Sequence, residues 1–170
     1  PDFDLNKREK IIDTNYINKV TKGTYELGSV FKTFTVAAGF NEKIIKADTK
    51  FENLPKIINP TECEGRPISE YDMEIPSNLT VEEILIRSGN IGTVKIAQEL
   101  GIERFKGFLS KIGILKPIDF DIEEVASQSN VKWRRCKLWT ASFGHGVTTT
   151  LLQLAKGYAI ISNGGYDIRP

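Results

Sequence analysis

Cysteine and histidine are scarce in this sequence of 170 residues, which contains two cysteines and one histidine. Cys63, Cys136 and His145 match no metal-ligand spacing and no Cys-x-x-Cys redox pair, so we expect no metal site and no cofactor. Two cysteines permit one disulfide bond, but so sparse a pattern does not reveal the redox compartment. The sequence leaves open whether these two cysteines form a disulfide bond.

The sequence also lacks an excess of charge of either sign and a long apolar run. Lysine and arginine together number 23 against 22 acidic residues, which gives no reason to propose nucleic acid or an anionic membrane as the main partner. No apolar segment approaches the roughly 20 residues that a membrane-spanning helix needs, and no signal peptide follows Pro1. We therefore expect the chain as given to be soluble.

Apolar residues make up 40% of the sequence, enough for a core, and we expect residues 1–170 to form one domain. Many of them recur with helical spacing. Thr80, followed three residues later by Glu83, has the form of a capping box. Gly101 and Gly113 follow two neighbouring periodic segments, which favours two antiparallel helices there. The expected helices span about residues 29–39, 81–88, 91–100, 105–112 and 151–161.

Two segments, residues 44–76 and 116–132, lack the helical period. The first contains four prolines and short apolar runs, which predicts a loop with short strands. The second is polar and interrupted by a proline. Strong strand candidates are nearly absent, so the fold class we expect is mainly α. Both ends read as cut from a longer protein, because Gly164 and Gly165 lead into what resembles the approach to a strand.

One pair of residues has the chemistry of a nucleophile and its base. Ser29 and Lys32 lie at the expected start of a helix, where side chains three residues apart share a face. Burial among the neighbouring phenylalanines would lower the pKa of Lys32, and a neutral lysine can accept a serine proton. The alternative is a helix N-cap followed by a surface lysine. The same spacing arises about once by chance in a chain of this length, and Ser129 with Lys132 repeats it in a polar stretch.

A second polar motif, Ser88-Gly89-Asn90, stands at an expected junction between helices, where side chains can project into a cleft. By itself it also fits a turn in which Asn90 caps the next helix. A serine-histidine pair from Ser142 and His145 is a weaker candidate. The glycines beside His145 favour a loop position at the rim of the cleft.

With their flanks, the first two motifs resemble the transpeptidase domain of class B penicillin-binding proteins over almost the whole chain. Before its nucleophile that family has tyrosine or phenylalanine, glutamate, proline, glycine and serine, and residues 25–29 read Tyr-Glu-Leu-Gly-Ser, with Leu27 in place of the proline. The stretches 90–97, 141–147 and 152–155 are similar to further family signatures. Asparagine at position 90 favours the septal, division-specific branch.

The resemblance implies a role for each residue of the two motifs. Ser29 would be acylated by a peptidoglycan peptide stem ending in D-alanyl-D-alanine, or by a β-lactam, and Lys32 would be its base. Ser88 would pass protons between Lys32 and the leaving amine, and Asn90 would hydrogen-bond Lys32 and the substrate backbone. The chain would thus belong to a serine D,D-transpeptidase that cross-links peptidoglycan.

The resemblance also implies a fold and a location. The chain would be the helical portion of an α/β, β-lactamase-like domain, with most of the central sheet outside residues 1–170. The helices after Ser29 and from Leu151 would pack on that sheet, so we expect their uncovered apolar face to self-associate or to be locally disordered. The parent would be an inner-membrane protein that faces the periplasm and binds other division proteins.

The third motif of the family, lysine followed by serine or threonine and then glycine, is absent, because Lys22-Gly23-Thr24 has these residues in the wrong order. Without the strand that carries it, the chain alone would turn over little, since losing one oxyanion donor costs about 3 to 4 kcal/mol. Two alternatives remain. One is a penicillin-sensing or β-lactamase-like relative, and the other is a non-catalytic helical interaction module.

Overall fold

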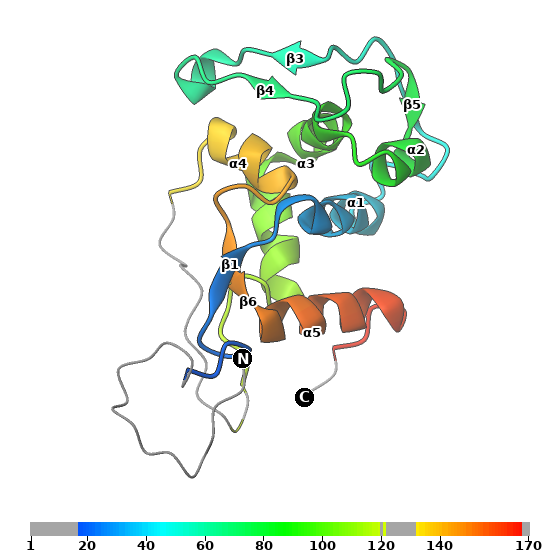
Figure 1. Cartoon of the computed structure of the whole chain (residues 1–170). Helices are drawn as coiled ribbons and strands as arrows, with labels where there is room; N and C mark the ends of the chain where they lie inside the picture. The colour runs from blue at the N-terminus through cyan, green and yellow to red at the C-terminus, as the bar shows by residue number, and fades with distance from the viewer. Residues whose placement is uncertain (1–16, 120, 122–131, 168–170) are drawn as a thin grey trace.

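A computed structural model describes residues 17–119, 121 and 132–167 of the chain. Helices account for most of its regular structure (Figure 1). Within the described residues, no helix is both long enough and apolar enough to cross a bilayer. The α-helices are α1 (Lys32–Asn41), α2 (Val81–Ile86), α3 (Asn90–Lys111), α4 (Arg135–Ser142) and α5 (Leu151–Ser162), and the 3₁₀ helices are η2 (Gly28–Phe31) and η3 (Thr61–Cys63).

The described strands are short and form three antiparallel pairs, which confirms the mainly α fold class. Two pairs, β2 with β5 and β3 with β4, lie within or beside the proline-rich segment, as predicted for short strands in a loop. The pair β1 with β6 was not predicted. The strands are β1 (Thr24–Glu26), β2 (Lys50–Phe51), β3 (Ile57–Ile58), β4 (Ile68–Ser69), β5 (Leu79–Thr80) and β6 (Thr148–Thr150).

The pairing of β1 with β6 positions the start of α1. Thr24 lies opposite Thr150 and Glu26 opposite Thr148, so the segment before Ser29 runs beside the segment before α5 (Figure 1). Threonine has a high strand propensity, but three threonines in a row show no alternation of polar and apolar residues. The strand therefore depends on a partner that is distant in sequence.

Two helices begin with a capping box. At α2, Glu83 N donates to Thr80 Oγ1 at 3.1 Å, and Thr80 N donates to Glu83 Oε2 at 2.8 Å, which confirms the predicted box. At α5, Thr150 and Gln153 form the same reciprocal pair. This second box is buried, and Gln153 Nε2 also donates to Lys116 O at 2.8 Å, so it ties the start of α5 to the loop after α3.

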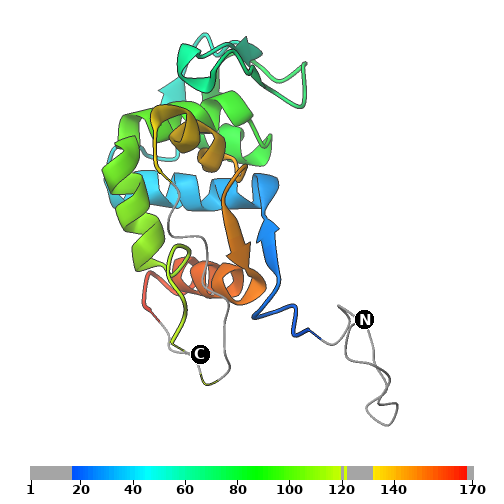
Figure 2. The ribbon, with the colours of Figure 1, turned by 90° about the vertical axis from the view of Figure 1, so that its left-hand side faces the viewer.

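Two helical segments do meet at Gly101, as predicted, but the prediction that they are antiparallel is wrong. α3 is one element with a kink at Gly101, whose φ of 73° and ψ of 168° lie outside the helical range. Its two halves run in different directions but do not fold back beside each other (Figure 2). The positive φ explains the glycine. The chain bends at Gly101 but does not reverse its direction, because the residues after Gly101 are helical again and no loop separates the two halves.

α4 was not predicted, and a disulfide bond fixes its position. Cys63 in η3 and Cys136 in α4 are bonded, with their Cα atoms 5.0 Å apart, which answers the question that the sequence left open. The buried residues of α4, Leu138, Ala141 and Ser142, share one face of the helix, but only two of them are apolar, so the sequence carries a weak helical signal. Its position therefore depends on the cross-link and on packing against α3.

Aromatic side chains form the centre of the larger core. The Phe31 ring lies edge-on to Phe34 and Phe105, with centroids 5.4 Å and 6.4 Å away, and all three side chains are fully buried. A smaller apolar cluster lies where α2 and the start of α3 meet the β2–β5 region. The larger core surrounds the first turns of α1, and this makes the environment of Lys32 apolar.

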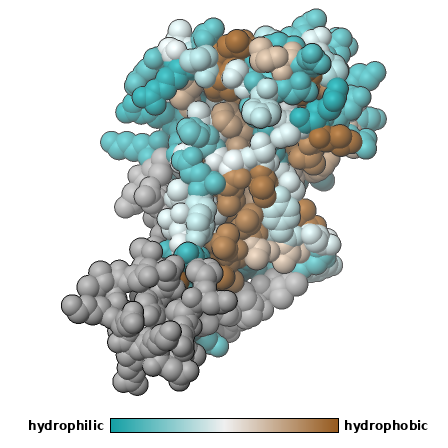
Figure 3. All heavy atoms as spheres, in the orientation of Figure 1, coloured by the Kyte–Doolittle hydropathy of each residue, from teal (hydrophilic) through white to brown (hydrophobic). Residues whose placement is uncertain are grey.

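Apolar residues form a band across the middle of one face, over parts of α1 and α5 (Figure 3). Large exposed apolar side chains include Phe40 in α1, Leu151 in α5 and Val30 in η2, just before α1. The expectation that this face self-associates stays a prediction. A strictly monomeric chain with uniform amide protection from hydrogen exchange would contradict it.

Candidate active site

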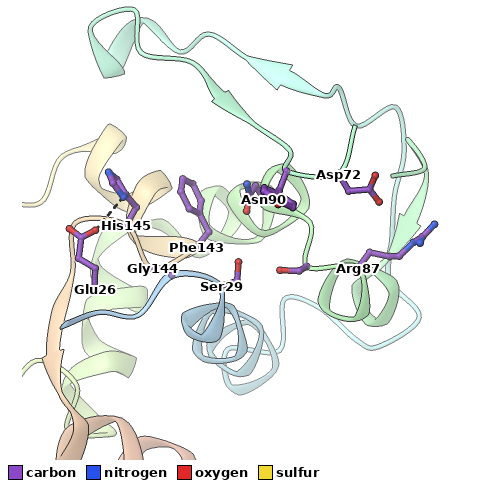
Figure 4. A pocket seen from close by; sticks show the side chains of 11 residues that line it. Glu26, Ser29, Asp72, Arg87, Asn90, Phe143, Gly144 and His145 are labelled. Atoms are coloured by element: carbon purple, nitrogen blue, oxygen red, sulfur yellow. Dashed lines mark ion pairs between the residues drawn. The ribbon is translucent and has the colours of Figure 1, made fainter. Parts of the chain in front are cut away.

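A cleft of about 410 Å³ opens between the start of α1, the α2–α3 junction and the loop after α4. Ser29, Ser88 and Asn90 line this cleft together (Figure 4). Lys32 lies beneath it and reaches Ser88. The structure therefore brings together all four residues predicted for the site. Ser129, the serine of the alternative pair, lies outside the described residues.

Ser29 sits in η2, and its side chain is exposed to the cleft. Gly28 has a φ of 55°, in the left-handed region, which turns the chain sharply from β1 into the helix. The Ser29 hydroxyl makes no hydrogen bond within the described residues, so its lone pairs are free to meet a ligand. The helix that starts here was predicted at this position, and the tight turn before it explains the glycine.

The loop after α4 is hydrogen-bonded to the turn that precedes Ser29. Gly28 N donates to Gly144 O at 3.3 Å, and Thr35 Oγ1 donates to Ser142 O at 2.7 Å. A Cβ atom added at Gly144 would lie 2.1 Å from Gly28 O, and the φ of Gly144 is +82°. Both the close approach and the backbone angle therefore require glycine at position 144.

Lys32 is 1% exposed. Desolvation by burial lowers the pKa of its amine from 10.5 to about 8, against a smaller opposing effect of the Glu70 carboxylate. Its Nζ donates to Ser88 Oγ at 3.0 Å and also to Ser88 O. The sequence predicted both the burial of Lys32 and the direction of its pKa shift.

Ser88 has an unusual backbone that presents two oxygens to Lys32. Its φ is 55°, in the left-handed region that residues with a Cβ rarely adopt. Ser88 N donates to Leu85 O at 3.1 Å and Gly89 N to Ile84 O at 2.8 Å, which closes the end of α2. Such a conformation costs of order 1 kcal/mol or more and persists where its surroundings enforce it.

Asn90 is half-buried, and its amide does not contact Lys32. Its Nδ2 donates instead to Ser69 O at 2.7 Å, while both hydrogen bonds of Lys32 within the described residues go to Ser88. The implied hydrogen bond between Asn90 and Lys32 is therefore absent from the described part of the chain. The reason is that β4 runs beside the start of α3 and offers a nearer carbonyl.

His145 lies at the rim of the cleft, as predicted, and does not pair with Ser142. Its Nδ1 is 3.3 Å from Glu26 Oε2, and Gly146 N donates to Glu26 Oε1 at 2.9 Å. Ser142 Oγ is turned away and donates to Trp139 O at 2.6 Å. Glu26 thus fastens the loop after α4 to β1, a role that nothing in the local sequence indicated.

Lys137 also stabilises the loop after α4. Its Nζ donates to Gly146 O, and burial lowers the pKa of the amine while Glu26 raises it. Among the described residues, no group of three or more histidine, cysteine, aspartate or glutamate side chains is arranged to hold a metal ion. What the described site offers chemically is hydroxyl groups and a buried amine.

Comparison with known proteins identifies the family. The profile of the penicillin-binding protein transpeptidase domain matches residues 1–170. The chain belongs to this family. The probable peptidoglycan D,D-transpeptidase FtsI of Caulobacter vibrioides is 32% identical over 171 residues, which cover 100% of this chain and 28% of that protein. The probable peptidoglycan D,D-transpeptidase PenA of Neisseria gonorrhoeae is 27% identical over 97% of this chain and 28% of its own length.

Solved structures have the same fold as this transpeptidase-family chain. The transpeptidase domain of Burkholderia pseudomallei penicillin-binding protein 3, in its apo form, superposes with a TM-score of 0.79 at 28% identity, over 89% of this chain and 45% of that one. The imipenem acyl-enzyme complex of Mycobacterium tuberculosis penicillin-binding protein A gives a TM-score of 0.81 at 21% identity, over 91% of this chain and 36% of that one. The present chain thus spans less than half of each solved chain.

Proposed function

We propose that this chain forms the nucleophile-bearing part of a serine D,D-transpeptidase that cross-links peptidoglycan peptide stems and is acylated by β-lactams. The observation that carries the proposal is the buried Lys32 amine, which is bonded to Ser88 beneath the cleft that Ser29 lines. For a lysine with only a structural role, such burial is unfavourable, because desolvation disfavours its charged form. For a general base the same burial is useful, because it increases the fraction of neutral amine that can accept a proton.

In the proposed reaction, neutral Lys32 accepts the proton of the Ser29 hydroxyl as the serine oxygen attacks the carbonyl carbon of the penultimate D-alanine. The bond from that carbon to the amine of the terminal D-alanine breaks, and the proton reaches the leaving amine through Ser88. An amine of a second peptide stem then attacks the ester on Ser29 and regenerates the hydroxyl. With a β-lactam, the ring amide takes the place of the D-alanyl-D-alanine bond.

Acylation of Ser29 should depend on pH through Lys32. With a pKa of about 8, Lys32 is mostly protonated below that pH and mostly neutral above it. At pH 7 about one tenth of the molecules carry the neutral amine, against about one in three thousand for an ordinary lysine. The acylation rate constant should therefore rise through a midpoint near pH 8, measured with a fluorescent penicillin. A flat profile between pH 6 and 9 would argue against Lys32 as the base.

The cellular setting is also proposed. Disulfide bonds persist in oxidising compartments, and the Cys63–Cys136 bond is compatible with the bacterial periplasm. The relatives named FtsI and Asn90 together favour the septal, division-specific branch. We expect the full-length protein to be held at the inner membrane and to act with other division proteins.

The direct test is to locate the covalent adduct. The full-length protein is treated with a penicillin and digested with trypsin, and the peptides are analysed by mass spectrometry. Cleavage after Lys22 and Lys32 yields residues 23–32, in which Ser29 should carry the adduct. An adduct on another peptide, or none, would overturn the proposal. The 170-residue chain alone should be labelled more slowly by about a hundredfold or more, since it lacks the third motif.

A further inference from the structure

Glu70 is a buried carboxylate that is hydrogen-bonded to the start of α3, next to the proposed site. It follows β4, its side chain is 5% exposed, and its backbone N–H donates to Lys56 O at 2.9 Å. Its two carboxylate oxygens accept from successive backbone N–H groups, Oε2 from Asn90 N at 2.6 Å and Oε1 from Ile91 N at 2.8 Å. Because a buried carboxylate is costly unless hydrogen-bonded, this pairing fixes the position of Glu70.

These bonds supply the cap that α3 lacks. Gly89, at the N-cap position, has no side chain to accept a hydrogen bond, so the first N–H groups of the helix need an acceptor from elsewhere. Glu70 provides one, and its negative charge also suits the positive end of the helix dipole. The start of α3 is therefore fixed by a residue some 20 positions earlier in the chain.

The same carboxylate is coupled to the turn whose Ser88 contacts Lys32. Asn90 is two residues after Ser88, and a Cβ added at Gly89, between them, would lie 3.7 Å from Glu70 Oε1. Fixing the start of α3 thus restrains the turn in which Ser88 keeps its left-handed conformation. Glu70 is also the charged group that acts on Lys32, and its effect opposes desolvation.

Other charged side chains lie further along the cleft. Asp72 and Arg87 are at one end, and Glu26 and His145 are at the other (Figure 4). The pKa of Lys32 is lowered by desolvation and raised by the Glu70 carboxylate. Removing the charge of Glu70 should therefore lower the pKa of Lys32 further.

We propose that Glu70 is a positioning residue of the serine-lysine site, which holds the Ser88-Gly89-Asn90 turn against Lys32 and supplies a compensating negative charge to it. The inference rests on the proposed function, because it assigns Glu70 a part in that reaction. It predicts that the charge and the length of the side chain at position 70 affect acylation separately. The charge changes the proton affinity of Lys32, and the length of the side chain changes the positions of Ser88 and Asn90.

The test uses Glu70→Gln and Glu70→Asp in the full-length protein, with Glu74→Gln as the matched control. Glu74 is an exposed carboxylate on the same loop, and its side chain makes no hydrogen bond or ion pair within the described residues. The rate constant for acylation by a fluorescent penicillin is measured from pH 5 to 10. In parallel, Lys32 is titrated by NMR of the labelled side chain, a readout that does not depend on activity.

Glu70→Gln removes the charge and places an amide N–H against a backbone N–H. We expect its high-pH rate constant to fall by about tenfold to a hundredfold, as for a displaced catalytic group, and the Lys32 midpoint to move to lower pH. Glu70→Asp keeps the charge but is too short to span both N–H groups. Its midpoint should stay near that of the wild type while its rate constant falls. Glu74→Gln should change neither quantity.

The outcomes distinguish a failure of the proposed function from a failure of the role proposed for Glu70. If the wild type is not acylated, the proposed function fails, while the NMR titration still reports whether Glu70 acts on Lys32. If the wild type is acylated and Glu70→Gln retains its rate constant and its Lys32 midpoint, the inference is overturned. For Glu70→Gln, a fall in the rate constant with an unmoved Lys32 midpoint would also overturn it, because the charge would then have no effect on Lys32. If Glu70→Gln does not fold, a Glu70→Asp variant that keeps the wild-type rate constant, or whose Lys32 midpoint moves, would overturn it.

Discussion

Replacing Ser29 with alanine in the full-length protein is expected to abolish covalent labelling by a fluorescent penicillin. The acyl bond forms on this oxygen in the proposed mechanism, so the rate should fall by on the order of a thousandfold or more. Stability should change by less than about 0.5 kcal/mol, because the hydroxyl is exposed and makes no hydrogen bond within the described residues. Gel fluorescence measures the labelling, and thermal unfolding measures the stability.

Ser129→Ala is the matched control, because Ser129 and Lys132 repeat the serine-lysine spacing. This variant should be labelled at the wild-type rate. Labelling that survives Ser29→Ala but is lost in Ser129→Ala would move the nucleophile to the second pair. Labelling that survives in both variants would show that another residue is acylated, and the assignment of Ser29 as the nucleophile would then be wrong.

Breaking the disulfide bond should destabilise this part of the protein by about 4 kcal/mol. Cys63 and Cys136 are 73 residues apart in sequence, and closing a loop of that length removes much of the conformational entropy of the unfolded chain. The variant Cys63→Ala with Cys136→Ala should therefore unfold at a markedly lower urea concentration. Labelling should also weaken, since α4 leads into the loop that contacts Gly28.

Reduction provides the control for this prediction. A reducing agent should lower the urea midpoint of the wild type about as far as the double substitution does, and it should leave the double variant unchanged. Each single substitution should have nearly the full effect, because either one breaks the bond. A wild type that is indifferent to reduction would contradict a stabilising role for the cross-link.

The helices could be predicted where the sequence carries a local signal. The capping box of Thr80 and Glu83 and the apolar stripe of α5 need only neighbours three or four positions away, and both were confirmed. α4 could not be predicted, because its position depends on Cys136 and on packing against α3. The kink at Gly101 was mistaken for a reversal, since a glycine after an apolar stripe marks a stop or a bend equally well.

The residues of the candidate site were likewise predictable only where the sequence carries a local signal. The residue types and spacing of Ser29 and Lys32 suggested a nucleophile and a base, and the phenylalanines around Lys32 suggested its burial. The partner of Asn90 was predicted wrongly, because the carbonyl of Ser69 comes close to it only in the folded chain. Glu70 was missed altogether, since a single glutamate in a loop carries no local signal.

The sequence by itself determined the helical segments other than α4, the serine-lysine chemistry and the resemblance to the family, because all of these follow from residue types at short, fixed spacings. The tertiary structure alone decided that Lys32 meets Ser88, 56 residues away, that β1 pairs with β6, and that Glu70 caps α3. The physical reason is that local conformation depends on near neighbours, whereas burial and the pKa of Lys32 depend on which distant segments pack around it.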